Sequence, residues 1–233
     1  MKLRFATYNI HKAVGLDRRR DPERILAVLR EIDADIIALQ EADRRLGERA
    51  SVLPRALIDD TPWRVVPVAR RARSIGWHGN ALLVRRDMDI RESHALDLPT
   101  LEPRGAVCGE LEVEGRKIRV IGTHLDLSGL RRRDQVRALI DFADEARGGH
   151  PTVIMGDFNQ WGRASGAMRE FERNWTLLTP GRSYPSRAPI ATLDRIVASR
   201  DWRCVDAEVH HTALSARASD HLPVIAELEL PKN

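Results

Sequence analysis

The sequence has few cysteines, few aromatic residues and no long hydrophobic run. Cys108 and Cys204 are the two cysteines among 233 residues, and neither has a His or Cys partner close in sequence. This excludes a disulfide framework and a zinc motif, and we expect both to be buried free thiols in strands. No apolar run approaches the roughly 20 residues of a membrane-spanning helix. Residues 1–6 lack the apolar core of a signal peptide, so we expect a cytoplasmic protein without a transmembrane segment.

Lysine is also scarce, with four residues at positions 2, 12, 117 and 232, so arginine carries nearly all the positive charge. The formal net charge is +4 at pH 7. Because a guanidinium group matches the geometry of phosphate, this composition favours a phosphate-bearing partner. An arginine-biased composition that only solvates the surface explains the same counts equally well.

Strand-like segments outnumber helical ones, in a chain whose 42% hydrophobic and 31% charged residues are typical of a soluble globular protein. We expect one domain over residues 1–233. Asp21-Pro22-Glu23 is a typical helix start, and further helices are expected at 130–146 and 165–171. The expected strands cover residues 3–8, 35–39, 63–68, 79–85, 90–96, 106–113, 117–123, 152–155, 191–198, 203–209 and 223–230. This mixture predicts packed sheets with helices outside.

Polar residues of catalytic type directly follow apolar, strand-like runs at six places. If the strands of two packed sheets end together, these residues meet at one rim of the molecule. A single case would be an ordinary solvated strand end, but six cases with carboxylates, amides and imidazoles indicate a site. The residues are Asn9, Glu41, His124, Asp157 with Asn159, Asp194, and Asp220 with His221.

The candidate ligands are mainly carboxylate and amide oxygens. Such oxygens suit a hard cation, Mg²⁺ or Mn²⁺, rather than zinc. Mg²⁺ usually takes one or two carboxylates and keeps several waters, which leaves room for a phosphate. The two histidines then remain for proton transfer or for stabilising charge on a phosphoryl oxygen.

The order of these motifs resembles that of the endonuclease/exonuclease/phosphatase superfamily, the group of deoxyribonuclease I, exonuclease III, neutral sphingomyelinases and inositol polyphosphate 5-phosphatases. Each motif alone is short, but the ordered set spans almost the whole chain. The motifs are Tyr8-Asn9-Ile10-His11, Leu39-Gln40-Glu41, Pro103-Arg104-Gly105-Ala106, Gly122-Thr123-His124-Leu125, Gly156-Asp157-Phe158-Asn159, Leu193-Asp194-Arg195-Ile196 and Ser219-Asp220-His221.

The resemblance implies an α+β fold, a four-layer α/β/β/α sandwich in which two mixed β-sheets pack face to face with helices outside. It implies a Mg²⁺- or Mn²⁺-dependent hydrolase of phosphoester bonds, in which water attacks in line. Its site residues would divide into two groups. The metal would be held by Glu41, with Asn9 and Asp220 beside it. The catalytic group would be the proton-transfer His221 with its orienting Asp194, the water- and phosphate-orienting Asp157 and Asn159, and the phosphate-side donors His124 and Arg104.

Two departures from the family pattern bear on the substrate. Leu125-Asp126-Leu127 follows His124, where the abasic-site endonucleases have Tyr-x-Pro-Asn, so we expect weak or no activity at abasic DNA sites. Arg195 follows Asp194, where many relatives carry an aromatic residue. No carboxylate that would orient His124 stands out. Asn80, in Gly79-Asn80-Ala81-Leu82, resembles a family position near the site but is an amide.

Three hypotheses remain open on the substrate and role. The first is a phosphodiesterase or nuclease that acts on nucleic acid. The second is the same chemistry on a phospholipid headgroup, an inositol phosphate or another small phosphoester. The third, a non-catalytic binding module, predicts decay of the ligand set, which is complete here. No obligate protein partner is evident. A basic collar is one further expectation, from Arg18 to Arg20, Arg131 to Arg133, and Arg70, Arg71 and Arg73.

Overall fold

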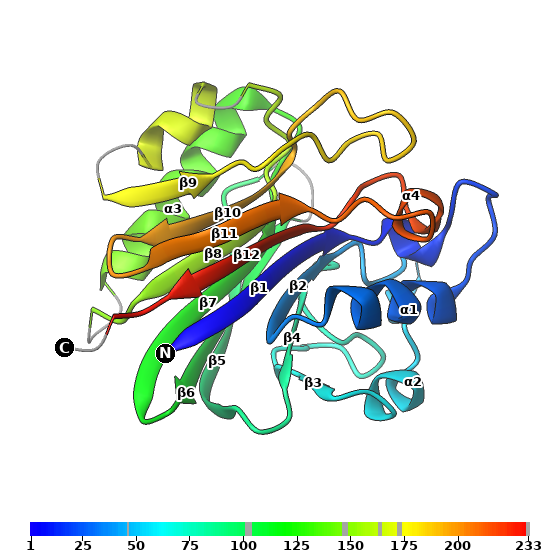
Figure 1. The fold of residues 1–233 in the computed structure, drawn as a ribbon, viewed down its shortest axis with the longest axis horizontal. Coiled ribbons are helices and arrows are strands. Elements are labelled where there is room, and N and C mark those ends of the chain that lie inside the picture. Colours follow the sequence, from blue (N-terminus) through cyan, green and yellow to red (C-terminus); the bar gives the residue numbers. More distant parts are fainter. Residues whose placement is uncertain (46, 101–103, 146–148, 163–164, 172–173, 232–233) are drawn as a thin grey trace.

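Two β-sheets packed face to face form the centre of this computed structural model, which describes residues 1–45, 47–100, 104–145, 149–162, 165–171 and 174–231 (Figure 1). Within those residues each sheet has six strands. The order in the first is β11-β12-β1-β2-β4-β3, and in the second β5-β6-β7-β8-β10-β9. The bounds in the first sheet are β1 Lys2–Asn9, β2 Ile36–Gln40, β3 Trp63–Val65, β4 Ala81–Arg85, β11 Arg203–Val209 and β12 Val224–Glu229. Those in the second are β5 Asp89–Asp97, β6 Gly105–Val113, β7 Arg116–His124, β8 Thr152–Asp157, β9 Trp175–Leu178 and β10 Asp194–Ser199.

Each sheet has a parallel pair at its centre, β1 with β2 and β7 with β8, and its other described neighbours run antiparallel. A parallel pair needs a crossover connection. Helix α1 (Pro22–Ile32) supplies it for β1 and β2, and α3 (Gly129–Glu145) for β7 and β8. Figure 1 shows these two helices on opposite outer sides. The expected four-layer sandwich of two mixed sheets is therefore confirmed.

The core is divided among the layers by the two-residue alternation of the strands. In β1, Leu3 and Phe5 face the second sheet and join a cluster with Val107 and Met155. Ala6 and Tyr8 point to the opposite side, where they pack with Ile25 and Leu29 of α1. A third cluster joins α3 to the second sheet through Val136 and Leu139. Strands buried on both faces explain the nearly continuous apolar runs in the sequence.

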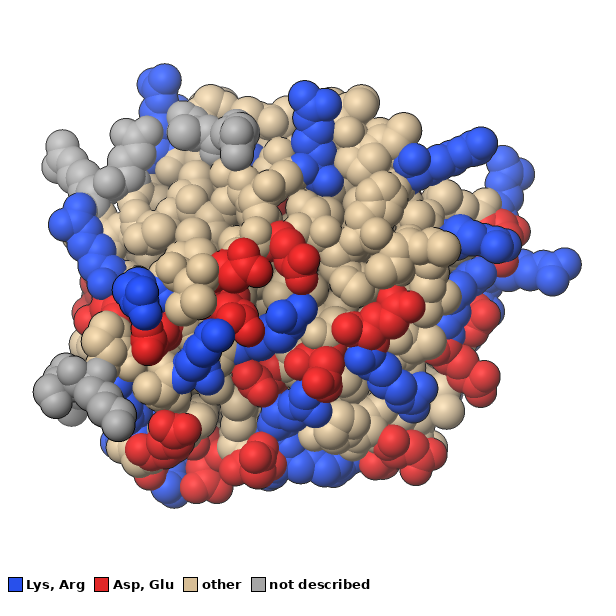
Figure 2. Space-filling view, in the orientation of Figure 1, with Lys and Arg blue, Asp and Glu red and all other residues tan. Residues whose placement is uncertain are grey.

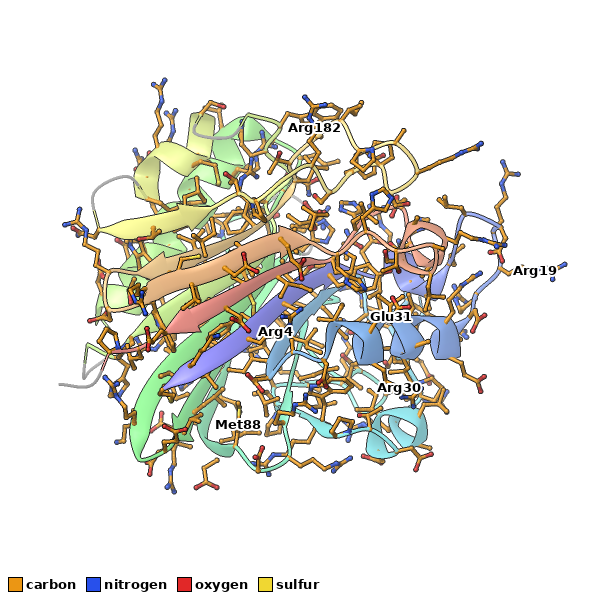
Figure 3. The ribbon with its side chains drawn as sticks, in the orientation of Figure 1. Arg4, Arg19, Arg30, Glu31, Met88 and Arg182 are labelled. Carbon is orange, nitrogen blue, oxygen red and sulfur yellow. The ribbon has the colours of Figure 1, made fainter. Side chains whose placement is uncertain are left out.

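Helix α1 begins where the sequence predicts. Asp21 is its N-cap, and the Asp21 Oδ1 atom accepts a hydrogen bond from the Arg24 backbone N at 3.0 Å. Such a cap contributes about 1 kcal/mol. The far end of the helix is tied to β1, because Arg4 Nε donates to the Ile32 carbonyl at 3.0 Å (Figure 3). This tie fixes α1 against the strands that lead to Asn9 and Glu41.

Several expected elements are shorter or of another type. Residues 165–171 form a 3₁₀ helix, η2 (Gly166–Phe171), and the strand expected over 63–68 ends at Val65, before Pro67, which has no N–H to donate. Strand β9 and the short helices η1 (His11–Ala13), α2 (Arg55–Asp59) and α4 (Ser215–Ala218) were not predicted. Cys108 is buried as expected, but Cys204 is exposed, because β11 is an edge strand.

The described helices include none with both the length and the apolar character required to cross a membrane. The longest of them is α3, with 17 residues.

Candidate active site

The strand ends bring the predicted polar residues to one rim. The parallel strands β1, β2, β7 and β8 end there, and the antiparallel strands β10 and β12 begin there. In the register, Asp157 is opposite both His124 and Asp194. A Cβ on Gly156 would lie 1.9 Å from the Thr123 carbonyl oxygen, so only glycine allows this close approach of β8 to β7 just before Asp157.

His221 and Asp194 form a buried hydrogen-bonded pair, as the sequence predicts. His221 Nδ1 lies 2.8 Å from Asp194 Oδ2, and the side chains are 7% and 0% exposed. Ser183 Oγ donates to the same carboxylate oxygen at 2.6 Å, and the Tyr184 ring lies 4.8 Å from the imidazole. These contacts fix the orientation of the imidazole and direct its Nε2 atom towards Asp157, whose Oδ2 is 3.7 Å away.

The side chain of Asp157, from the second sheet, is hydrogen-bonded to the side chain of Asn9, from the first sheet. Its Oδ2 accepts a hydrogen bond from Asn9 Nδ2 at 3.0 Å and lies 3.4 Å from His124 Nε2. Its Oδ1 accepts from the Asn159 backbone N at 2.9 Å. Asp157 is therefore the carboxylate next to His124 that the sequence left unassigned. Both are almost fully buried.

The two histidines are held in opposite protonation states by their surroundings. Burial alone would lower the pKa of His221, but the carboxylates of Asp194 and Asp157 raise it to about 10. Burial lowers the pKa of His124 to about 4, against the attraction of Asp157. For Asp157, burial alone would raise the pKa, but the two histidines lower it. At neutral pH the site thus holds an imidazolium, a neutral imidazole and a carboxylate.

Glu41 and Asp220 stand next to the two strands that flank β1, Glu41 after β2 and Asp220 before β12. Glu41 directly follows β2 with a left-handed backbone, φ 55°, and its Oε2 atom forms an ion pair with Lys12 Nζ. Asp220 Oδ1 lies 3.8 Å from His11 Nδ1 and 3.4 Å from Ser219 Oγ. Ser219 Oγ in turn donates to the Asn9 carbonyl at 2.7 Å. Asn9 therefore links the Asp157 cluster to the segment that carries Asp220.

One group of three side chains in the described chain has potential metal-ligand atoms within 4.8 Å of one another. It consists of Asp157, Asp194 and His221, not of the predicted Glu41 and Asp220. An imidazole must be neutral to bind a metal, whereas His221 is bonded to Asp194 and has a raised pKa. These three side chains are therefore better suited to holding a proton on His221 than to binding a metal.

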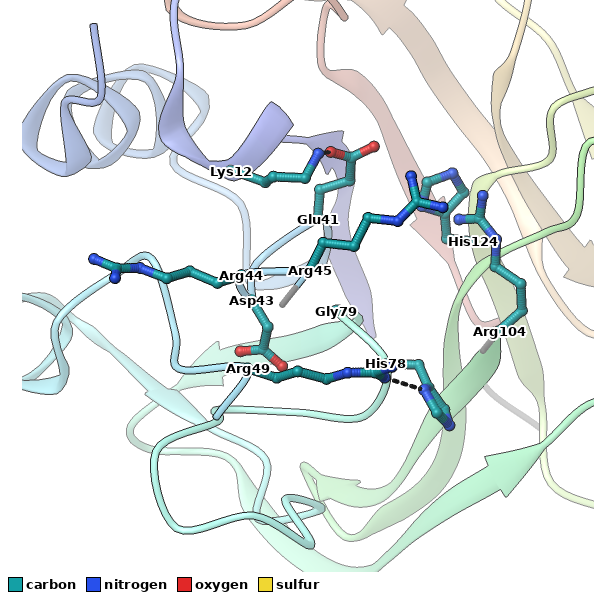
Figure 4. A pocket seen from close by; sticks show the side chains of 10 residues that line it. All are labelled: Lys12, Glu41, Asp43, Arg44, Arg45, Arg49, His78, Gly79, Arg104 and His124. Carbon is teal, nitrogen blue, oxygen red and sulfur yellow. Dashed lines mark hydrogen bonds and ion pairs between the residues drawn. The ribbon is translucent and has the colours of Figure 1, made fainter. Parts of the chain in front are cut away.

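A cavity of about 250 Å³ opens beside Glu41 and His124 (Figure 4). Its described lining is rich in arginine, from the loop that follows Glu41 and from Arg104. His78 joins the lining from the turn before β4 and lies 3.0 Å from Arg49 Nη1 through its Nδ1 atom. The lining residues are Lys12, Glu41, Asp43, Arg44, Arg45, Arg49, His78, Gly79, Arg104 and His124.

Comparison with known proteins identifies the family. A model of the Endonuclease/Exonuclease/phosphatase family matches residues 6–221. The chain belongs to this family. It is 27% identical over 245 aligned residues to the Escherichia coli (strain K12) protein named "Uncharacterized protein YbhP", with 96% of this chain and 95% of that protein covered.

Solved structures show the same family fold. D. rerio TDP2 complexed with a single-strand DNA product matches with a TM-score of 0.77 and 14% identity, covering 98% of this chain and 99% of that chain. A mannosyl-6-phosphatase of Bacteroides thetaiotaomicron matches with a TM-score of 0.74 and 20% identity, covering 97% and 99%. At such identities the likeness concerns the fold alone.

The remaining residues of the family motifs take defined places. Asn159 Nδ2 donates to the Leu125 carbonyl at 2.8 Å, which joins the two loops that follow β7 and β8. Asn80 is buried and donates to the Gly105 carbonyl at 2.9 Å, next to Arg104. Pro103 of the Pro103-Arg104-Gly105-Ala106 motif lies outside the described residues. His11 stays at the rim, with Nδ1 3.1 Å from the Val14 carbonyl.

Some site residues of this family member were not predicted. Ser183 is eleven positions before Asp194 in a turn-rich loop, and only the fold brings it back to that carboxylate. Lys12 and the arginines at 44, 45 and 49 resemble ordinary surface charges in sequence. The arginines of the expected basic collar do not line the described cavity. Arg132 instead donates hydrogen bonds to the Leu127 carbonyl and to Gln160 Oε1, and the Arg70 guanidinium lies over the Trp77 ring.

Proposed function

We propose that this chain is a divalent-metal-dependent phosphoesterase, acting as a phosphodiesterase or nuclease. The observation that carries the proposal is the buried His221–Asp194 pair, 2.8 Å apart, directed at Asp157. A buried imidazolium next to a carboxylate is costly in the core of a protein. Its place at an open strand-end rim favours a catalytic purpose.

Glu41, with Asn9 and Asp220 beside it, would hold Mg²⁺ or Mn²⁺. Two observations support the fit. Glu41 Oε2 forms an ion pair with the Lys12 ammonium group, which supports a role for this carboxylate in binding a cation. The nearby donors are oxygens, which hard cations prefer. When bound, the metal would neutralise negative charge on the phosphate and on the attacking oxygen.

The side chains divide the proton chemistry. Asp157, ionised at neutral pH, would accept a proton from the attacking water, and Asn159 would orient that water and the phosphate. His221 would donate a proton from Nε2 to a phosphoryl or leaving oxygen, while Asp194 holds its Nδ1. His124, neutral at this pH, and Arg104 would donate hydrogen bonds to phosphoryl oxygens.

The identity of the substrate is a separate part of the proposal. Relatives of this fold include a protein bound to a single-strand DNA product and a sugar phosphatase. A nucleic acid phosphodiester is our first candidate, and a phospholipid headgroup, an inositol phosphate or another small phosphoester is the second. A non-catalytic module would not need the buried His221–Asp194 pair.

A Mg²⁺-dependence screen tests the proposal. Bis-p-nitrophenyl phosphate, plasmid DNA, RNA, phospholipids and an abasic duplex would be incubated with the protein, with and without EDTA, beside the His221→Ala variant. We expect EDTA-sensitive hydrolysis of at least one phosphodiester, lost in His221→Ala, and little incision at abasic sites. If the wild-type protein hydrolyses none of these substrates with Mg²⁺ or Mn²⁺, the enzymatic proposal is wrong.

A further inference from the structure

The exposed hydrophobic side chains are concentrated at the rim that carries the site. Among the described residues six large hydrophobic side chains are exposed, and five of them lie in segments that adjoin this rim. The sixth, Val205, is on the edge strand β11. Single exposed hydrophobic residues need no explanation, but their concentration at one end of a molecule indicates a binding surface. The five residues, called the rim hydrophobics below, are Leu16, Leu127, Leu130, Trp161 and Ile190.

Two of the rim hydrophobics, Leu16 and Ile190, are anchored near His221. The backbone N of Leu16 donates to the carbonyl of Arg217, in the short helix α4 that precedes β12, at 3.1 Å. The backbone N of Ile190 donates to the carbonyl of Tyr184 at 2.8 Å, and the Tyr184 ring lies 4.8 Å from the His221 imidazole. Both side chains are therefore exposed from segments whose backbone is held beside the site.

Leu127, Leu130 and Trp161 form a second group, in the two segments that follow β7 and β8. Arg132 joins these segments, because its Nη1 atom donates to the Leu127 carbonyl at 2.6 Å and its Nη2 atom to Gln160 Oε1 at 3.1 Å. Leu130, in the first turn of α3, is 77% exposed. The three side chains therefore belong to one connected part of the rim.

Trp161 has an exposed ring on a fixed backbone. Its side chain is 61% exposed and has no hydrogen bond or ring contact with a described residue. The carbonyls on both sides of it, those of Gln160 and Gly162, accept hydrogen bonds from Arg195 at 2.7 and 2.8 Å. An indole presented in this way suits an interface, where its ring is in apolar surroundings and its N–H is near polar groups. The other four tryptophans contact the protein through their rings or N–H groups: Trp63, Trp77, Trp175 and Trp202.

Unpaired arginines accompany the rim hydrophobics. Four arginines in the same segments have no ion pair, side-chain hydrogen bond or ring contact with any residue that the structure describes. On the face over β11, β12 and β1, by contrast, acidic and basic side chains are interspersed and form pairs such as Lys2 with Glu227 at 2.6 Å (Figure 2). Basic side chains stand out along the upper edge of that view, where Arg182 lies (Figure 3). The four arginines are Arg18, Arg131, Arg182 and Arg187.

We propose that this rim docks onto a membrane surface that contains anionic phospholipid, with the rim hydrophobics in the interface and the four arginines at the headgroups. Apolar side chains next to cationic ones bind such surfaces, because the first enter the boundary of the acyl chains and the second attract anionic lipids. The rim hydrophobics comprise one tryptophan and four aliphatic side chains. Single-stranded nucleic acid is bound mainly by aromatic rings that stack on its bases, so this composition favours lipid.

The consequence for the substrate rests on the proposed function. In a docked protein the strand-end rim faces the lipid headgroups. A phosphodiester of a phospholipid headgroup therefore moves ahead of nucleic acid as the substrate. Docking itself depends on neither a metal nor hydrolysis, so it can be measured separately from activity.

Vesicle sedimentation in EDTA tests the docking surface. The protein would be mixed with vesicles of phosphatidylcholine alone, or of phosphatidylcholine with an equal amount of phosphatidylglycerol. We expect binding to the anionic vesicles that is about 10-fold weaker in Trp161→Ala and in Leu130→Ala, through the loss of buried apolar surface. Arg182→Gln and Arg187→Gln should each weaken it about 5-fold, the scale for one arginine at an anionic surface. Val205→Ala removes the exposed hydrophobic side chain of β11 and should bind like the wild-type protein.

Tryptophan fluorescence locates the anchor and completes the test. Anionic vesicles should shift the emission of the wild-type protein to shorter wavelength, and Trp161→Leu should lose this shift while it retains most of the binding. Absent vesicle binding, or binding that is equal in wild type, Trp161→Ala and Leu130→Ala, would overturn the proposal. Trp161-dependent binding of a single-stranded oligonucleotide without vesicle binding would assign the rim to nucleic acid instead. Vesicle binding without hydrolysis of any substrate in the screen above would contradict the proposed function alone.

Discussion

The His221 side of the site and the cavity beside Glu41 are built in different ways. On the His221 side, Asn9, Asp157 and Asp194 stand at the ends of paired strands. Asn9 donates a hydrogen bond to Asp157, and His221 lies between Asp157 and Asp194. Around the cavity, Arg45, Arg49 and His78 come from loops and turns outside the sheets. The first region is fixed by the backbone ladders, and the second by side-chain contacts such as that between Arg49 and His78.

This difference suggests a division of labour. Proton transfer needs groups held to within a fraction of an ångström, which paired strands provide. Substrate choice varies among enzymes of one fold, and loops can vary without disturbing the sheets. We therefore expect substitutions on the His221 side to lower the rate on every substrate, and substitutions around the cavity to change the preference among substrates.

The largest effect is expected from His221→Ala. Loss of the proton donor should lower kcat by about 10²–10⁴-fold, the usual scale for a general acid–base group. The reduction should be similar for bis-p-nitrophenyl phosphate and for any other phosphodiester that the wild-type protein hydrolyses, as measured by initial rates with Mg²⁺. His210→Ala is the matched control, because His210 pairs with Glu31 of α1 and should retain full rate. A substrate-dependent loss in His221→Ala would remove the contrast between the two regions.

Glu41→Gln should follow, with a loss of about 10³-fold at low metal concentration, because the metal supplies several kcal/mol of transition-state stabilisation. Unlike the His221 variant, it should regain part of its activity as Mg²⁺ or Mn²⁺ is raised. The Glu41 side chain is 24% exposed, so the fold should persist. Rates across a metal titration, with circular dichroism as the folding control, check this. Full activity in trace metal would contradict the assignment of Glu41.

A smaller effect concerns acid stability through His124. Its pKa is about 4 in the folded protein, below the usual 6.5, so the folded state favours the neutral ring. The stability of the folded state that depends on the neutral His124 ring is fully present above pH 6.5 and is lost as the pH falls towards 4. Between pH 7.5 and 4.5, wild-type protein should lose on the order of 2 kcal/mol more unfolding free energy than His124→Gln. Urea unfolding of both proteins in EDTA at the two pH values would show equal losses if the prediction is wrong.

The contrast between strand ends and loops also explains which features of the fold and the site the sequence could predict. A polar residue after an apolar strand is visible as a local pattern, and strands that end together then bring such residues into contact. This local pattern predicted that the polar residues share one rim, whereas the hydrogen bond between His221 and Asp194 and the four-layer fold were predicted from the resemblance of the ordered motifs to the family. Strand bounds were off by a few residues mainly where a pairing partner, such as β4 for β3, decides the end.

The cavity could not be predicted in the same way. Arg45 and Arg49 lie in a segment without regular structure between β2 and α2, and no periodicity shows where they point. Three other arginine groups, including Arg131 to Arg133, had an equally strong sequence signal. Arg132 turned out to bond the loop carbonyls of Asp126 and Leu127. Tertiary packing decides which arginines line the cavity, and no local sequence pattern indicates them.

Arg195 joins a strand to a loop on the His221 side and gives the smallest expected effect. It follows Asp194 in β10 and is fully buried, yet its Nη2 atom donates to the loop carbonyls of Gln160 and Gly162 at 2.7 and 2.8 Å. Burial lowers its pKa to about 10, so it remains charged at neutral pH. Arg195 therefore holds the loop that follows Asp157 and Asn159 against the strand that carries Asp194.

In Arg195→Met the side-chain volume is kept while both carbonyls lose their donor, which should lower the unfolding free energy by about 1–3 kcal/mol. Because Asn159 would then be less well positioned, kcat should fall about 10-fold on every substrate with little change in KM, as a misplaced positioning group predicts. Arg195→Lys, which restores one donor, should recover part of kcat. Arg203→Met, on the exposed edge strand β11, is the control for loss of an arginine. A loss of stability with unchanged kcat in Arg195→Met would make Arg195 a purely structural residue, and a change in KM alone would show that it acts on substrate binding instead.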